Sequence, residues 1–343
     1  MARPLTGLKI VEMAGLGPAP FACYLLASLG ADVTRIEAKG RSAVFLPLDP
    51  QTNPDVLYRQ IVQLDLKSEE DRLEALELIG NADVLVEGFR PGVMERLGFS
   101  PDAMLAHNNG LIYARMTGYG QEGPMADRAG HDLNYIATSG VLSMIGRRNG
   151  APVPPLNLIG DYGGGTMVLI MGILSALYAR AQTGKGQVVD AAMVDGSAML
   201  ATPIFSFMAS GMWDGGKRGS NLLDSGCPFY DTYETSDGGF VAVAPLEPQF
   251  FAALVEGLGL DPVWLERQYV RSHWDALRTL LTDRFRTRSR DEWAALFADS
   301  DACVTPVLTP REAAEHPHNK ARQSFDTVAG HIMPAIAPRF TSK

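Results

Sequence analysis

Short apolar runs and longer amphipathic stretches alternate along the first forty residues. The runs LKIVEM (8–13) and DVTRIEA (32–38) predict strands, and FACYLLASLG (21–30) predicts a helix between them. A loop rich in glycine and proline joins the first strand to this helix. The chain is therefore expected to begin with a strand–helix–strand unit.

A second unit of the same kind follows. Ser68 is a candidate N-cap, the helical pattern continues to about Ile79, and DVLVE (83–87) predicts the next strand. LIYARM (111–116) predicts one more strand. Strands that alternate with helices at this spacing are typical of an α/β fold with a mostly parallel sheet, covered by helices on both faces.

The pattern changes in the second half of the chain. After Gly160 the sequence is helical for some twenty residues, VVDAAM (188–193) predicts a strand, and SAMLATPIFSFMASG (197–211) predicts a helix. The polar stretch 213–226 is expected to be a linker. Beyond it, two β-rich runs joined across Asp237-Gly238-Gly239 predict a hairpin.

Helical patterns then extend from Pro248 to about Ala298, followed by the short apolar run VTPVL. At roughly 150 residues per domain, the 343 residues suggest about two domains. We expect a large Rossmann-like α/β domain over 1–215 and a smaller α+β domain over 222–320. The segment 321–343 includes the apolar run MPAIAPRF and is expected to pack back on the large domain.

Composition narrows the class of protein. Hydrophobic residues make up 46% and charged residues 20% of the chain, which is typical of a soluble, folded protein. Thirty Lys and Arg against 39 Asp and Glu give a formal charge of -9, without a basic block. This balance argues against nucleic acid or an anionic membrane as a general partner, although it leaves room for local basic pockets.

Compartment and metal content can be predicted from the cysteines and the N-terminus. Cys23, Cys227 and Cys303 lie far apart, so they favour a reducing compartment over a disulfide framework and show no metal spacing. The N-terminus shows no secretory pattern. The apolar stretch from Met167 to Ala179 is shorter than the roughly 20 residues that span a bilayer. We therefore expect a cytoplasmic protein.

The loop Gly15-Leu16-Gly17-Pro18-Ala19-Pro20 follows the first strand, and Glu37 comes about twenty residues later. In position this resembles a dinucleotide fingerprint, but Pro20 stands where the third glycine is needed. The prolines also remove amide donors that a pyrophosphate would use. We interpret the segment as a tight loop with proline in the first helical turn.

Polar islands interrupt the apolar sequence and carry the candidate chemistry. His131 and Asp132 lie in the first island, Asp161 lies in Asn157–Gly165, and Glu247 follows the strand-like FVAVAP. A histidine suits proton transfer near neutral pH, although a lone histidine is more often structural. Asp161 could be a helix N-cap, a catalytic carboxylate or both, and Glu247 alone looks like a helix-start residue.

Basic residues gather on loops that follow predicted strands. Arg90 lies in GFRPG directly after DVLVE, Arg96 comes about two turns later, and Lys67 lies in LDLK. Each is separately more often a solvated surface residue. Open α/β sheets bind ligands at the carboxyl ends of their strands, so their shared location favours an anionic ligand.

Several segments spread in order over nearly the whole chain are distinctive together: GLKIVEMAGLGPAP, LDLKS, ADVLVEGFRPGVMERLG, LIYARMTGYGQEGP, AGHDLNY, PPLNLIGDYGGGTM, GKGQVVDAAMVDG, YDTYE, EPQF and DACVTPVL. With these segments the chain resembles the family III CoA-transferase superfamily and, within it, the racemase branch. The resemblance implies an interlocked homodimer whose active site lies between the large domain of one chain and the small domain of the other.

The resemblance also implies roles for individual residues. His131 and Asp161 would be the two proton-transfer residues, with Asn157 orienting Asp161 and Glu247 bonding to His131 across the interface. The implied CoA contacts are Leu64, Asp65, Leu66, Lys67, Gly88, Phe89, Arg90, Pro91, Gly92, Arg96, Gly130, His131, Asp132, Leu133, Asn134 and Tyr135. Where racemase relatives place an arginine near the adenine, this chain has Ala38, and Lys39 or Arg41 is a candidate substitute.

The resemblance implies a reaction that interconverts (2R)- and (2S)-2-methylacyl-CoA through an enolate, with no metal or organic cofactor. Amides near Asp161 or in Gly163–Gly165 could stabilise the enolate oxygen. The alternative is a CoA-transferase of the same fold, in which Asp132 would be the covalent nucleophile. A CoA-ester binder without turnover and an NAD-dependent dehydrogenase are disfavoured by the His131, Asp161 and Glu247 set and by Pro20, respectively.

Overall fold

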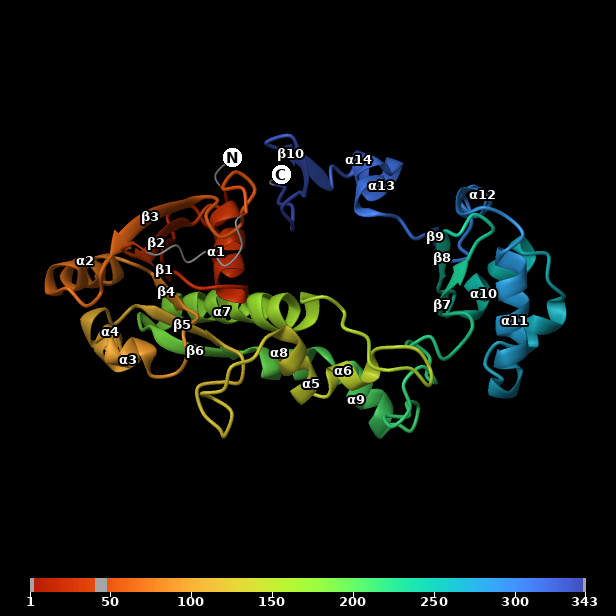
Figure 1. Cartoon of the computed structure of the whole chain (residues 1–343), viewed down its shortest axis with the longest axis horizontal. Coiled ribbons are helices and arrows are strands. Elements are labelled where there is room, and N and C mark those ends of the chain that lie inside the picture. Colours follow the sequence, from red (N-terminus) through yellow and green to blue (C-terminus); the bar gives the residue numbers. More distant parts are fainter. Residues whose placement is uncertain (1–2, 41–47, 342–343) are drawn as a thin grey trace. The chain divides into compact units, whose positions relative to one another are not determined.

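The computed structural model describes residues 3–40 and 48–341. The chain divides into two compact units, shown with the sequence colouring in Figure 1. Unit 1 comprises Met1–Val141, Pro154–Thr202 and Pro317–Lys343, and unit 2 comprises Leu142–Val153 and Pro203–His316. The C-terminal segment thus groups with unit 1, and a short segment near residue 150 groups with unit 2.

Unit 1 is built on a six-stranded sheet in the order β3-β2-β1-β4-β5-β6, and all neighbouring strands are parallel. The strands are β1 (Lys9–Met13), β2 (Asp32–Ala38), β3 (Arg59–Leu64), β4 (Val84–Glu87), β5 (Ile112–Thr117) and β6 (Gln187–Ala192). The predicted α/β class and parallel sheet are confirmed. The sequence patterns missed β3, because this edge strand is mostly half-buried or exposed and lacks a continuous apolar run.

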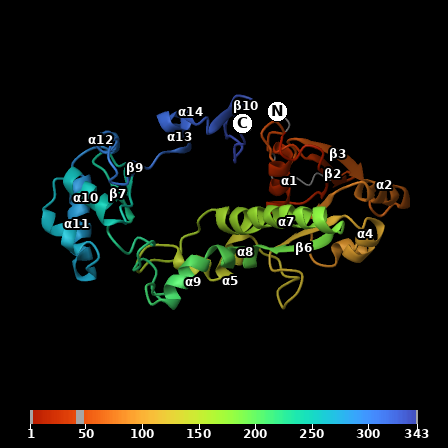
Figure 2. The same ribbon diagram turned by 180° about the vertical axis from the view of Figure 1, so that it is seen from behind.

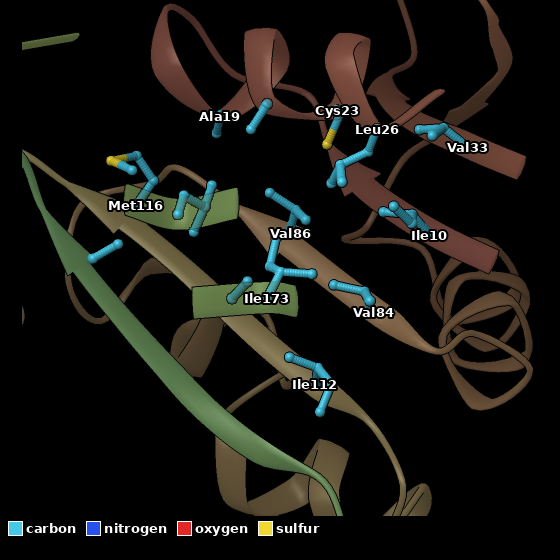
Figure 3. Packing of buried hydrophobic residues seen from close by; sticks show 14 of the residues in the cluster. Ile10, Ala19, Cys23, Leu26, Val33, Val84, Val86, Ile112, Met116 and Ile173 are labelled. Atoms are coloured by element: carbon cyan, nitrogen blue, oxygen red, sulfur yellow. The ribbon is translucent and has the colours of Figure 1, made fainter. Parts of the chain in front are cut away.

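Helices cover both faces of this sheet because its central strands are apolar on both sides. One core cluster joins Ile10, Val84 and Ile112 to helices α1 and α7 (Figure 3). A second cluster joins the alternate positions, such as Val11 and Leu85, to α2 and its neighbours. The helices are α1 (Pro18–Ser28), α2 (Glu69–Gly80), α3 (Val93–Arg96), α4 (Pro101–His107) and α7 (Val168–Thr183).

A π-helix, η1 (Leu158–Met167), runs directly into α7 and forms one continuous helix with it. Figures 1 and 2 show α7 lying along the sheet. Within the described residues, Leu158–Thr183 is the one helix whose length and composition would allow it to cross a membrane. Core helices pass the same test, and α7 buries Leu169, Ile173 and Ala176 against the sheet.

The last strand of the sheet leads into two short helices, α8 (Met193–Leu200) and α9 (Thr202–Ala209). The sequence suggested one helix over 197–211, but the chain breaks it next to Pro203, whose ring and missing amide disfavour a continuous helix. Shorter elements of the chain are α5 (Asp132–Thr138), α6 (Val141–Met144), α14 (Pro317–Ala321), β10 (Phe325–Val328) and β11 (His331–Pro334).

Unit 2 contains a three-stranded antiparallel sheet packed on helices. The predicted hairpin is present as β7 (Asp231–Glu234) and β8 (Phe240–Val243), and β9 (Val304–Pro306) pairs with β8. Besides α9, which belongs to this unit from Pro203 on, its helices include α10 (Pro248–Gly257), η2 (Pro262–Arg267), η3 (Arg271–His273), α11 (Trp274–Phe285), α12 (Arg290–Leu296) and α13 (Pro310–Glu315). A separate apolar cluster forms the core of this unit.

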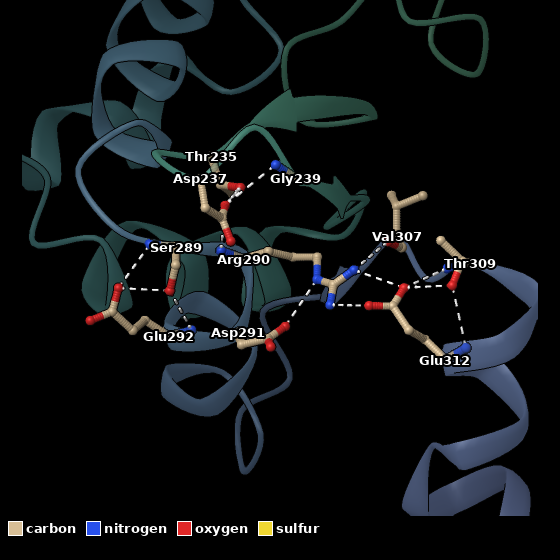
Figure 4. Close-up of polar contacts among 10 residues, drawn as sticks. All are labelled: Thr235, Asp237, Gly239, Ser289, Arg290, Asp291, Glu292, Val307, Thr309 and Glu312. Carbon is tan, nitrogen blue, oxygen red and sulfur yellow. Dashed lines mark hydrogen bonds and ion pairs between the residues drawn. The ribbon is translucent and has the colours of Figure 1, made fainter.

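A polar clamp holds the chain where it leaves the sheet of unit 2 (Figure 4). The Arg290 guanidinium donates to both carboxylate oxygens of Glu312, at 3.1 and 2.7 Å. Glu312 also accepts from the amide and hydroxyl of Thr309, which caps α13. These contacts lower the pKa of Glu312 to about 2, so the clamp stays charged over the physiological pH range.

Helix α8 lies unusually close to η1 because two glycines meet there. A Cβ added at Gly196 would lie 1.9 Å from the carbonyl oxygen of Gly164. We predict that Gly196→Ala lowers the free energy of unfolding by about 1–3 kcal/mol, although alanine is the better helix former. Urea denaturation measures the loss.

Gly110→Ala is the matched control. Its added Cβ would meet its nearest atoms at 3.6 and 3.8 Å, which are ordinary contacts. This variant should unfold like the wild type. Equal stability of Gly196→Ala and Gly110→Ala would contradict the close-contact explanation.

Candidate active site

The carboxyl ends of the parallel strands in unit 1 meet at one edge of the sheet. The loops after β1, β3, β4 and β5 leave from this edge. Open parallel sheets bind their ligands there. Nearly all the candidate residues of unit 1 lie on these loops or on the helices that follow them, α5 and η1.

His131 and Asp161, thirty positions apart in sequence, come together at this edge. His131 has extended backbone immediately before α5, and its side chain is exposed. Asp161 is half-buried in the first turn of η1. Asp132, the residue after His131, accepts the amide of Asp161 at 2.8 Å, and the charge of His131 lowers the pKa of the Asp161 carboxyl. The structure therefore brings the two proposed proton-transfer groups to one site.

Several contacts set the protonation of Asp161. Burial is the largest influence and raises the pKa of its carboxyl, and the nearby Asp132 raises it further. Asn157 Nδ2 donates to Asp161 Oδ2 at 3.1 Å and opposes the rise, as does His131. The net effect is a raised pKa, which brings this carboxyl closer to the range in which it can both take up and release a proton.

Asp132 holds the start of η1 against the start of α5. Its Oδ2 accepts the amides of Gly160 at 2.6 Å and of Asp161 at 2.8 Å. The residue is only 4% exposed. Within residues 3–40 and 48–341, its Oδ1 has no hydrogen-bond partner. One oxygen is thus committed to structure, and the other is buried next to the site.

Two interpretations of the Asn157–Gly165 island are wrong. Asn157, not Asp161, occupies the N-cap position of η1. Gly163–Gly165 lie within the π-helix instead of forming an open turn, and the Asp161 amide already donates to Asp132. These amides are therefore engaged in the fold and do not form the predicted enolate-binding turn.

The Gly15–Pro20 loop belongs to the site, which the sequence interpretation as a plain tight loop overlooked. Its prolines do occupy the first turn of α1, as predicted. Gly17 has φ 74° and faces the carboxylate of Asp161, with 3.9 Å between an added Cβ and Oδ2. The Thr166 hydroxyl donates to the carbonyl of Pro18 at 2.8 Å. Its place after the first parallel strand was the available signal.

Two of the predicted anion-binding arginines lie near the same edge. Arg90 is exposed in the loop after β4, and its charge lowers the pKa of Tyr135, which burial nevertheless raises to about 12. The Tyr135 hydroxyl donates to the carbonyl of Gly130. Arg96, at the end of α3, turns its guanidinium back toward Gly92. Both guanidinium groups are available to an anionic ligand.

Lys39 and Arg41 are the proposed substitutes for the adenine-binding arginine that is missing at Ala38. Lys39 Nζ is 2.6 Å from Asp71 Oδ2, so its charge is already paired. Arg41 lies outside the described residues. The other predicted CoA contacts lie at the end of β3 and just after it, after β4 and at the start of α5: Leu64, Asp65, Leu66, Lys67, Gly88, Phe89, Pro91, Leu133 and Asn134.

Glu247 lies in unit 2, separate from the unit that carries His131. It follows β8 and occupies the exposed N-cap position of α10, with extended backbone. Its charge helps to raise the pKa of the Cys303 thiol, after the larger effect of burial. The helix-start interpretation is confirmed, whereas its pairing with His131 stays a prediction.

Comparisons with known proteins assign the chain to a protein family. A mouse protein named alpha-methylacyl-CoA racemase is 44% identical over 97% of this chain and 85% of its own length. The human protein of that name is 43% identical over 94% of this chain and 82% of its own length. An acetyl-CoA:oxalate CoA-transferase from Acetobacter aceti is 32% identical over 96% and 87%.

A crystal structure of a CAIB/BAIF family protein from Brucella suis superposes with a TM-score of 0.83 at 27% identity, covering 99% of this chain and 93% of that one. The family profile described as CoA-transferase family III matches residues 5–342. The chain therefore belongs to CoA-transferase family III.

Proposed function

We propose that the protein interconverts (2R)- and (2S)-2-methylacyl-CoA thioesters by moving one proton at the α-carbon. The observation that carries this proposal is the convergence of His131 and Asp161, whose carboxyl has a raised pKa. The racemase activity expected from the sequence agrees with the names of the mouse and human relatives. The protein acts as an isomerase on an acyl-CoA.

The reaction requires two proton-transfer groups on opposite faces of the α-carbon. In one direction His131 takes the α-proton, the electron pair delocalises into the thioester carbonyl as an enolate, and Asp161 returns a proton to the other face. The roles reverse for the other enantiomer. One C–H bond breaks and one forms at the same carbon, while one proton is gained by His131 and one is lost by Asp161, so the step involves no net oxidation or reduction.

A second candidate function is CoA transfer, which the Acetobacter relative is named for. It would use Asp132 as the nucleophile. In this structure Asp132 is almost fully buried and its Oδ2 accepts two amides of η1. This arrangement supports a role in holding Asp161 in place more than a role as a nucleophile.

The phosphates of CoA are proposed to lie near Arg90 and Arg96, whose guanidinium groups suit phosphate recognition. Independence from cofactors and a cytoplasmic location stay predictions.

We propose that the working unit is a homodimer. The exposed side of the helix formed by η1 and α7 carries an apolar stripe at helical spacing: Met167, the last residue of η1, is 49% exposed, and Met171, Leu174 and Tyr178 of α7 are 52%, 39% and 72% exposed. Apolar rows at this spacing are typical of helix–helix contacts. Among the residues that the structure describes, none of α9 is fully buried. A second copy of the chain would cover these surfaces and could bring its Glu247 to His131.

The first test follows the α-proton. One enantiomer of a 2-methylacyl-CoA, incubated with the enzyme in deuterated water, should invert and gain deuterium at the α-carbon. His131→Ala and Asp161→Ala should each lower the rate by about 10²-fold or more, because each removes an acid–base group. Chiral analysis and mass spectrometry measure both quantities.

The transferase alternative predicts a different result. CoA would move to an added free acid without α-exchange, and Asp132→Asn would abolish the transfer. Transfer without exchange in the wild type would rule out the racemase proposal.

The second test uses pH. In the direction in which Asp161 removes the proton, it must be ionised, so activity should fall as pH drops through its raised pKa. Asn157→Ala removes a hydrogen bond to the carboxylate and should move this limb to higher pH. Asp132→Asn removes a nearby negative charge and should move it to lower pH. If the pH profiles of kcat/KM for the two variants moved in the same direction, the assignment of this acidic limb to Asp161 would be contradicted.

The third test addresses the shared site. His131→Ala and Glu247→Ala chains are refolded separately and as an equal mixture. If each site combines His131 of one chain with Glu247 of the other, random pairing should restore about a quarter of the wild-type sites. Activity in the mixture that only matches the separate variants would count against a site built from both chains.

A further inference from the structure

A network of buried charges lies across three neighbouring strands of unit 1. Glu12 on β1 pairs with Arg35 on β2 and with Arg59 on β3, the latter at 2.9 Å between Oε2 and Nε. Arg35 Nε also pairs with Glu37 at 3.0 Å. The side chains of Glu12, Arg35 and Arg59 are 0% exposed. These charges lie inside the protein, close to α1.

A gain in folding stability does not by itself explain why these charges are buried. Removing a charged side chain from water costs several kcal/mol, and well-packed apolar residues are often as stabilising as a buried ion pair. Burial raises the pKa of Glu12 despite its two arginine partners, which reflects this cost. The remaining arginine donors point to another role.

Those donors reach the Gly15–Pro20 loop, chiefly at Pro20. Arg59 Nη2 donates to the carbonyl of Pro20, and Arg59 Nη1 donates to the carbonyls of Pro54 and Leu57. Arg35 Nη2 reaches the carbonyl of Gly15 at 3.5 Å, the long end of the hydrogen-bond range. Because Glu12 binds both arginines, it fixes the position of both guanidinium groups.

The far side of this loop faces the proton-transfer site. Gly17 lies opposite Asp161, and the carbonyl of Pro18 accepts from Thr166. A Cβ added at Gly165 would be 3.0 Å from Pro18 Cβ, so the loop and η1 are in close contact. A shift of the loop would therefore displace η1, the helix that carries Asp161.

We propose that Glu12, Arg35 and Arg59 are positioning residues, which act through the Gly15–Pro20 loop to hold Asp161 in place for proton transfer. A guanidinium suits this task, because its planar donors hold several acceptors in fixed directions. This inference rests on the proposed function. Loss of the network should lower kcat and leave KM almost unchanged, since its side chains are buried and, within residues 3–40 and 48–341, make no hydrogen bond or ion pair with Arg90 or Arg96.

The main experiment compares Arg59→Lys with Arg180→Lys. Lysine keeps the charge of Arg59 but cannot make its forked contacts. Arg180 is a matched control in the same unit: it binds Asp83 at 2.9 Å and the carbonyl of Gly110 at 3.1 Å, at the opposite, amino-terminal edge of the sheet. Racemisation kinetics, urea denaturation and hydrogen–deuterium exchange are measured for both.

Arg59→Lys should lower kcat by about 10-fold to 10²-fold with KM within about twofold, because small displacements of a reacting group have effects of this size. Amide exchange should accelerate in residues 15–20 and in η1. Arg180→Lys should keep the wild-type kcat per folded molecule. Equal kcat values for the two variants, or unchanged exchange in the loop of Arg59→Lys, would overturn the proposal.

Glu12→Gln keeps the shape of the network and removes only its central charge, so it serves if Arg59→Lys does not fold. The same fall in kcat and the same faster exchange are expected. Two separate measurements distinguish the two proposals. A wild-type enzyme that puts no deuterium on the α-carbon of the substrate would refute the racemase. Backbone amide exchange in residues 15–20 and η1 would still show whether the network holds the loop in place.

Discussion

One carboxylate oxygen joins the two segments that carry the candidate chemistry. Asp132 Oδ2 accepts the amides of Gly160 and Asp161, which lie 28 and 29 positions further along the chain. Because the acceptor is buried, its loss would leave two amides without partners, which is costly. The positions of His131 at the start of α5 and of Asp161 in η1 both depend on this contact.

The same contact helps to distinguish the two functions considered for this fold, racemisation and CoA transfer. A nucleophilic aspartate needs a reachable oxygen, whereas an aspartate that anchors a helix needs burial and fixed donors. Here burial and two amide donors favour anchoring, and the raised pKa of Asp161 favours proton transfer at the neighbouring carboxyl. The difference arises from the surroundings of the two aspartates and not from their chemical type.

The loops around the site are held from inside the protein. On one side the glycines at 164 and 196 allow α8 to lie close to η1, and on the other side the Gly15–Pro20 loop separates η1 from buried arginines. Buried residues behind these loops are therefore proposed to influence Asp161. Helix α7 behaves differently: one side packs on the sheet, while Met171, Leu174 and Tyr178 on its other side are exposed.

The sequence by itself determined the central strands, the hairpin of unit 2 and the identity of His131, Asp161 and Arg90 as candidates. Strands buried on both faces have apolar runs that local patterns reveal, whereas the edge strand β3 has none and was missed. Only the tertiary structure decided that Asp161 lies within a π-helix, that Lys39 is paired, and that the Gly15–Pro20 loop faces Asp161. Local patterns report burial, but contacts between distant segments follow from how helices and strands pack together.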